Sequence, residues 1–367
     1  MREALGIAVQ PVARRSLLNR LNLEVRAGNS LTRQIIINAV GLGTGLVIAA
    51  LVLVVAGVSP AALLKEFVVS IFTSPRSFSA VIVYATPLVI VGLSASIAFR
   101  ALFWNIGIEG QVIFGAIGAT LVANNDLGPE GIRLFTMGVA AAIGGMLWIA
   151  LPALLKLKLR VNEIITTLLM NYIAFNFLLH LLYGPWKDPQ SAFPHSKIYD
   201  AVERFSPLGW YKVNQSVLVA LALVLLVFWL LRFSRIGYLL SFVGSNPKMA
   251  RAVGIRVGGT VVFAALVSGA LAGLAGFTIC AGIDSRMTQS FFVGYGVSGI
   301  LIAFLARNNP LGVILFSLLM AVLMVAGQSL QVFYKIPFAM VQVIQALIVV
   351  SVAASEFFVR YRIRLVD

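Results

Sequence analysis

The residues most capable of chemistry lie in a short polar stretch inside an apolar part of the chain. Residues 103–111 read FWNIGIEGQ, so an acid, Glu109, stands between two amides, Asn105 and Gln111. A carboxylate at the centre of a bilayer costs at least about 2.5–3.5 kcal/mol on insertion scales, and such a residue therefore indicates function. Glu109 can serve a solute or ion pathway, or it can stabilise a broken helix by pairing with Arg100 or by capping the helix that follows.

A second polar set follows further along the chain, in the sequence VNEIITTLLMNYIAFNF. Glu163, Thr167 and Asn171 recur at i, i+4 and i+8, which places them on one face of a helix. On a membrane helix this stripe turns toward the bundle or a cavity, and it supplies either interhelical hydrogen bonds or a solute path. The candidate path residues are Phe103, Asn105, Glu109, Gln111, Thr167, Asn171 and Gln342. For the aromatic member, Phe103, stacking on a planar solute and simple core packing are both open.

Composition places these residues in a membrane protein. The 367 residues are 60% hydrophobic and 11% charged, whereas soluble domains have about 45–50% apolar and about 25% charged residues. The formal charge of +15 is typical of basic cytoplasmic loops and does not indicate nucleic acid. No G-x-x-x-x-G-K-[ST] nucleotide loop occurs, and His180 and His195 have no Cys or His companion at metal-ligand spacing. We expect a non-catalytic chain without a metal or cofactor of its own.

The apolar pattern predicts an all-α, polytopic membrane protein. A helix needs about 20 apolar residues to cross the hydrocarbon. We predict ten spans near 36–57, 79–99, 103–124, 135–155, 162–183, 214–232, 258–281, 293–306, 310–328 and 338–357. With both termini cytoplasmic, this arrangement places most of the 28 Lys and Arg residues inside. Residues 1–33 then form a cytoplasmic segment, 34–357 the transmembrane domain and 358–367 a cytoplasmic tail.

The third and eighth spans are interrupted by glycines and polar residues. They occupy similar stretches, 92–119 and 273–300, in two predicted halves of five helices each. Interrupted helices at membrane depth are tolerated only where they face protein or a water-filled cavity. Corresponding interruptions in two halves therefore indicate a transport site.

The predicted cytoplasmic segment 233–257 contains a short amphipathic piece. Residues 243–255 read VGSNPKMARAVGI, in which apolar residues alternate with Lys248 and Arg251. A short helix of this kind suits docking into the groove of another subunit, and a plain surface linker is the alternative.

Four motifs resemble those of a known family. GSNPKMARAVGI resembles the coupling segment of ABC-importer permeases of the ribose and branched-chain-amino-acid type. FWNIGIEGQ, NEIITTLLMNYIA and GYGVSGILIAFLARNNPLG (294–312) resemble motifs of its nucleoside branch, which basic-membrane-lipoprotein-type binding proteins serve. Trp104 and Val297 depart from the branch's usual residues. By resemblance, the ATPase-coupling residues are Gly244, Asn246, Met249, Ala250, Arg251, Gly254 and Ile255.

The resemblance implies the permease subunit of an ATP-driven importer in the bacterial cytoplasmic (inner) membrane. Nucleosides are the first candidate solutes and simple sugars the second. The implied partners are a cytoplasmic ATPase that binds ATP, an identical or homologous second permease and an extracytoplasmic substrate-binding lipoprotein. The alternative is a stand-alone secondary transporter driven by ions through Glu109 or Glu163. A membrane scaffold without transport would leave the interrupted helices unexplained.

Overall fold

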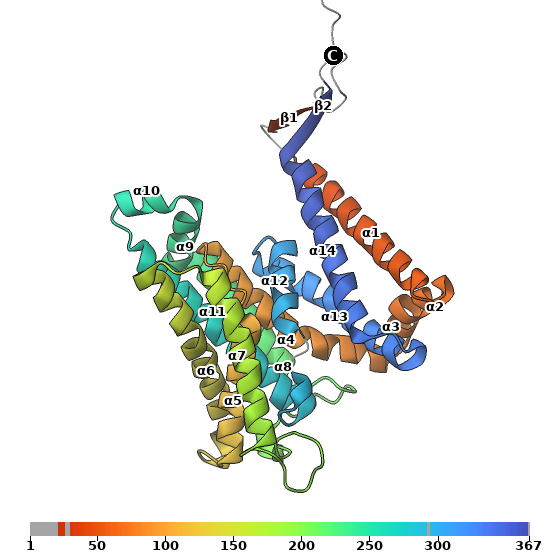
Figure 1. Cartoon of the computed structure of the whole chain (residues 1–367), viewed down its shortest axis with the longest axis vertical. Coiled ribbons are helices and arrows are strands. Elements are labelled where there is room, and N and C mark those ends of the chain that lie inside the picture. The colour runs from red at the N-terminus through yellow and green to blue at the C-terminus, as the bar shows by residue number, and fades with distance from the viewer. Residues whose placement is uncertain (1–20, 26–29, 292–293, 366–367) are drawn as a thin grey trace, which may run out of the picture. The chain divides into compact units, whose positions relative to one another are not determined.

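The chain is helical throughout most of its described length. The computed structural model describes residues 21–25, 30–291 and 294–365, and each predicted span coincides with a helix (Figure 1). These helices are α1 Leu31–Val55, α4 Pro75–Arg100, α5 Ile108–Asn124, α6 Glu130–Leu159, α7 Glu163–Tyr183, α8 Ser216–Phe233, α11 Val257–Ile279, α12 Tyr295–Leu305, α13 Pro310–Tyr334 and α14 Phe338–Arg360. The predicted all-α class is confirmed.

Helix length separates the interrupted spans from the others. Among the described residues, eight helices are long and apolar enough to cross a membrane. The other two, α5 and α12, belong to the two spans that the sequence predicts to be interrupted. An 11-residue helix such as α12 is about 16 Å long, roughly half the hydrocarbon thickness.

Several shorter elements had no counterpart in the predicted spans. They are α2 Pro60–Leu64, α3 Ser70–Thr73, α9 Arg235–Ser245, α10 Pro247–Ala252, π-helical turns at Lys65–Val69 and Cys280–Asp284, 3₁₀ turns at Ala201–Glu203 and Gln289–Phe291, and strands β1 Leu21–Val25 and β2 Tyr361–Leu365. Four helices, α2, α4, α10 and α13, begin with the same capping arrangement. A Ser or Asn side chain accepts a backbone N–H of the first turn, and a proline follows it.

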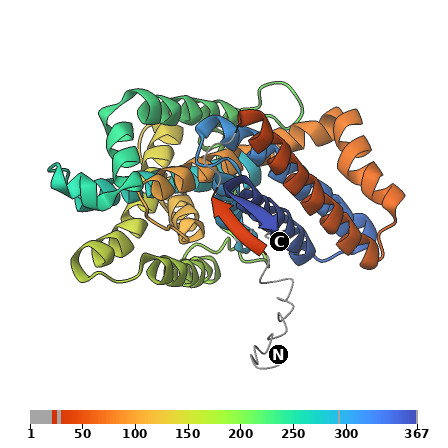
Figure 2. The ribbon, with the colours of Figure 1, turned by 90° about the horizontal axis from the view of Figure 1, so that it is seen from above.

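The chain divides into two compact units. The first comprises residues 1–48 and 348–367, and in its described part β1 pairs with β2 in antiparallel register, from Leu21 opposite Leu365 (Figure 2). Within this unit the start of α1 packs closely on the end of α14, because Gly41 faces Ser355 and Gly45 faces Ile348.

The second unit, residues 49–347, contains the helical bundle. Its central helix is α4, whose most apolar stretch is 89% buried, against 28% for α6 and 22% for α8. The outer helices therefore keep apolar faces for lipid. Glycines bring α5, α6 and α11 into backbone contact, since Gly115 and Gly145 both lie against Gly273.

Loops and short elements lie at two opposite ends of this bundle. At one end Arg100, Lys156 and Gly244 contact residues of the neighbouring loops. At the other end the loop 184–213 docks on residues 285–288, and Arg133 pairs with Glu203 at 3.2 Å. Figure 1 shows α9 and α10 at one end and this loop at the opposite end.

The glycine contacts predict a selective loss of stability. A Cβ on Gly273 would meet the backbone of Ala141, so we expect Gly273→Ala to cost about 1–3 kcal/mol and to lower the melting temperature in detergent. Gly131→Ala is the matched control, because a Cβ there meets open space. Equal melting temperatures for both variants would contradict this packing.

Candidate functional site

The interrupted segment, defined here as residues 101–107 between α4 and α5, is buried without being helical. The Ala101, Phe103 and Asn105 side chains have no exposed surface. Leu102 adopts a left-handed φ of 56°, and the Phe103 N–H turns back to the Ala98 carbonyl at 3.0 Å. Local turns pair some of its backbone N–H groups, and the remaining buried groups need partners from other helices.

Helix α7 supplies the first set of partners. Asn171 accepts the Gly110 N–H at 2.8 Å and donates to the Ile106 carbonyl at 2.9 Å. Thr167 accepts the Ile106 N–H at 3.2 Å. Gly107 lies so close to Thr167 that a Cβ would stand 2.7 Å from its carbonyl oxygen. The polar stripe predicted on this helix therefore holds the interrupted segment, which is the hydrogen-bonding role left open by the sequence.

A buried amide pair stabilises the same turn from its other side. Asn105 and Gln111 exchange two hydrogen bonds, at 3.0 and 2.8 Å. Asn105 also donates to the Ser268 hydroxyl of α11 at 3.0 Å, and Ser268 lies 3.0 Å from the Ser94 hydroxyl of α4. The two serines were not predicted, because a serine in an apolar helix gives no distinctive sequence signal.

Glu109 lies in the first turn of α5, but its carboxylate serves another helix. Its oxygens accept the N–H groups of Gly294 and Gly296 at 3.1 and 2.5 Å, at the start of α12. A carboxylate at a helix N-terminus satisfies free donors and interacts favourably with the helix dipole. Arg100, the other partner considered, instead donates from Nε and Nη2 to the Asn308 carbonyl, at 3.1 and 2.9 Å.

A basic residue on α6, Lys156, contacts the interrupted segment and Glu163 of α7. Lys156 donates to the Leu102 carbonyl at 3.2 Å and pairs with Glu163 at 2.5 Å. Its ammonium also lies 5.1 Å from the centre of the Phe103 ring. Phe103 is therefore packed inside the chain, which is the second of the two roles considered for it.

Most of the predicted path residues lie together, and one lies at the edge of the group. The interrupted segment contacts Thr167 and Asn171 of α7, and Glu109 contacts the start of α12. Gln342 is exposed, and its amide would lie 3.0 Å from a Cβ on Gly294. A role for these residues in the solute path stays a prediction.

The predicted coupling residues form α10 and its two flanks. The Asn246 side chain caps α10 by accepting from Lys248 and Met249 N–H groups, at 3.1 and 3.0 Å. Gly254 ends the turn with a left-handed φ of 84°, which favours glycine.

One face of this segment is buried and the other is open. Ala250 packs with Val243 and Val257, and Ile255 covers the edge of that cluster. Met249 and Val253 are 56% and 60% exposed. Arg251 is also exposed. Apolar and basic groups therefore share an outward face at one end of the bundle.

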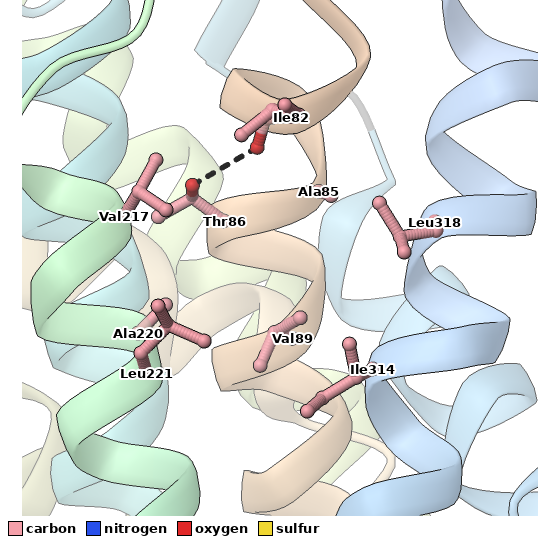
Figure 3. Close-up of a pocket in the computed structure, with 9 residues that line it drawn as sticks. All are labelled: Ile82, Ala85, Thr86, Val89, Val217, Ala220, Leu221, Ile314 and Leu318. Carbon is pink, nitrogen blue, oxygen red and sulfur yellow. Dashed lines mark hydrogen bonds between the residues drawn. The ribbon is translucent and has the colours of Figure 1, made fainter.

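Elsewhere in the bundle, an apolar groove separates α4, α8 and α13. Its walls include Ile82, Val89, Val217, Leu221, Ile314 and Leu318 (Figure 3). The hydroxyl of Thr86, which also lines it, donates to the Ile82 carbonyl of its own helix at 3.1 Å. Because the walls are apolar, they offer a polar solute no hydrogen-bond partner, and they are compatible with hydrocarbon.

The α7 contacts generate a second prediction. We expect Asn171→Ala to lower the unfolding free energy by about 1–3 kcal/mol, because it leaves the Gly110 N–H and Ile106 carbonyl without a partner. Asn176→Ala on the same helix is the control, since Asn176 is exposed and bonds only within its own turn at 2.8 Å in the described contacts. Thermal unfolding in detergent measures both, and equal stabilities would contradict the structural role of Asn171.

Comparisons with known proteins identify the family. Residues 77–353 match the family model described as the permease component of branched-chain amino acid transport systems. The chain is 36% identical to the glucose ABC transporter permease protein TsgB13 of Haloferax volcanii, over 87% of each chain. It is 30% identical to the guanosine ABC transporter permease protein NupP of Bacillus subtilis, over 85% of this chain and 90% of that protein. With the nucleoside ABC transporter permease protein NupB of Lactococcus lactis it shares 25% identity, over 89% and 93%. The chain therefore belongs to this family of ABC transporter permeases and is a multi-pass protein of the cytoplasmic membrane.

Proposed function

We propose that the chain is the permease subunit of an ATP-driven importer for a small hydroxylated solute, a nucleoside or a simple sugar. The observation that carries the proposal is the match over most of the chain to permeases named for glucose, guanosine and nucleosides. These solutes share ribose- or hexose-like hydroxyl groups.

In this proposal the chain binds no ATP, and a separate cytoplasmic ATPase contacts the outward face of α10. Met249 and Val253 offer apolar contacts there, and Lys248 and Arg251 offer charge. The buried Ala250 and the Asn246 cap hold this short helix in shape. A short helix that keeps its shape can be displaced by a moving partner, because it does not unfold under the contact.

A second permease and a substrate-binding protein complete the proposed assembly. Support for the second permease comes from α12, whose Val297 and Phe304 are 55% and 46% exposed. Helix α12 is too short to span the hydrocarbon and its open face is apolar, so we place this face against protein and not along an aqueous path. Gln342, exposed beside the start of α12, is the path candidate best placed to meet a solute.

The ion-coupled alternative has less support from the acids it requires. Glu109 is held by two backbone N–H groups, and Glu163 is paired with Lys156. Both carboxylates therefore have structural partners that proton or cation binding would disturb.

The proposed ATPase contact predicts a charge-sensitive phenotype. We expect Arg251→Glu to reduce ATP-dependent uptake and co-purification of the ATPase by about tenfold or more, because a like-charge contact costs several kcal/mol. Lys187→Glu makes the same charge change on an exposed residue of the opposite loop and should leave both measurements near wild type. Membrane insertion of each variant is checked by detergent extraction.

A second assay separates the two transport classes. Proteoliposomes that contain only this chain should move no solute under a proton or sodium gradient. Addition of the ATPase, the second permease, the binding protein and ATP should start uptake. Uptake driven by an ion gradient in the chain alone would contradict the importer.

A further inference from the structure

Helix α12 is held at both ends by charges from a single short stretch of chain. Glu109 accepts from the N–H groups of Gly294 and Gly296 at its start, and Arg100 donates to the Asn308 carbonyl just beyond its end. The negative group thus faces the positive end of the helix dipole, and the positive group faces the negative end. The stretch 100–109 therefore runs beside α12 in the opposite direction.

Aromatic contacts join the same two elements near the end of α12. The rings of Phe99 and Trp104 lie 5.1 and 5.8 Å from that of Phe304, and they lie 5.2 Å from each other. Such spacings are within the range of favourable ring pairs. We call Arg100, Glu109 and this aromatic trio the α12 clamp.

The turn at the end of α12 depends on the clamp. Arg307 and Asn308 both have left-handed φ values, 51° and 57°. Two consecutive non-glycine residues in this region are unfavourable unless surrounding contacts hold them. The two hydrogen bonds from Arg100 to the Asn308 carbonyl supply such a contact.

Arg100 also touches α9, the helix that directly precedes the proposed ATPase contact on α10. Gly244 in α9 lies directly against the Arg100 carbonyl oxygen, with no room for a Cβ. The backbone of Arg100 therefore contacts α9, while its guanidinium holds the end of α12. Because protein interiors are close-packed, a displacement at α9 is passed on to Arg100.

We propose that the α12 clamp makes α12 move as one body with α9 and α10, so that movement of the ATPase reaches the solute path through Arg100 and Glu109. This inference rests on the proposed importer function. In it, Arg100 and Glu109 are positioning residues that act through α12. The body includes the start of α5, because Glu109 belongs to that helix.

The clamp itself is tested on the isolated chain by hydrogen exchange. Glu109→Gln keeps the shape of the side chain but removes its charge, and it should speed amide exchange in peptides that cover residues 294–298. Glu130→Gln, an exposed acid in the first turn of α6, should leave these peptides unchanged. Unchanged exchange at 294–298 in folded Glu109→Gln would overturn the clamp, whatever the chain transports.

The coupling is tested in the assembled importer by a pair of spin labels. Ser241→Cys on α9 and Arg307→Cys, directly after α12, are both exposed sites away from Val297, and the native Cys280 is buried. The distance between the labels should be the same with and without bound nucleotide. In Arg100→Ala this distance should shift or broaden when nucleotide binds, and solute moved per ATP should fall by roughly 2- to 30-fold, the range carried by coupling energies of about 0.5–2 kcal/mol.

Control variants distinguish a specific effect of Arg100 from a general effect of substitution in α4. Arg76→Ala, at the exposed start of the same helix, should behave as wild type, and Arg100→Lys should restore part of the coupling by keeping one donor. If Arg100→Ala fails to assemble, Arg100→Met, which keeps a long side chain without a donor, carries the test. A nucleotide-independent distance and normal uptake per ATP in assembled Arg100→Ala or Arg100→Met would overturn the coupling. A wild-type chain that binds no ATPase would instead contradict the proposed function and leave the hydrogen-exchange result standing.

Discussion

The structure of the bundle depends on one constraint: backbone polar groups inside a membrane need partners from within the protein. Residues 101–107 leave the helix pattern between α4 and α5, and most of this segment is buried, so its N–H and carbonyl groups need partners within the protein. Side chains of α6, α7 and the segment itself supply several of these partners. Asn171 and Thr167 bind the Ile106 carbonyl and N–H, Lys156 binds the Leu102 carbonyl, and Asn105 accepts the Gly107 N–H.

The same constraint explains why separate motifs occur together in one chain. Each of the three intramembrane motifs contributes to one cluster, since Glu109 belongs to the first, Asn171 to the second and Gly294 to the third. The glycines allow close approach, as at Gly296, where a Cβ would meet the backbone of Glu109. A loss at any of these positions therefore affects more than its nearest neighbour. Within this chain Glu109, Thr167 and Asn171 bind backbone groups, and a role of the predicted residues in the solute path stays a prediction.

Much of the fold follows from the sequence, because length and apolarity alone decide whether a helix can cross a membrane. All ten predicted spans coincide with helices, and the two interrupted ones are the two short helices. The strands β1 and β2 were not predicted, since each is only five residues long and acquires its identity from pairing with the other. Partners distant in the chain were also beyond the sequence. Nothing in the spacing of Glu109 or Arg100 indicates Gly294 or Asn308 as the groups they bind.

The most direct test of this account is a cryo-electron microscopy structure of the assembled transporter in nucleotide-free and nucleotide-bound states. We expect α10 to contact the ATPase and the Glu109 carboxylate to bind the Gly294 and Gly296 amides in both states. Residues 101–107 should keep their α7 hydrogen bonds in both. A Glu109 carboxylate that leaves these amides for an open aqueous path, or an α10 that contacts lipid and no ATPase, would contradict it.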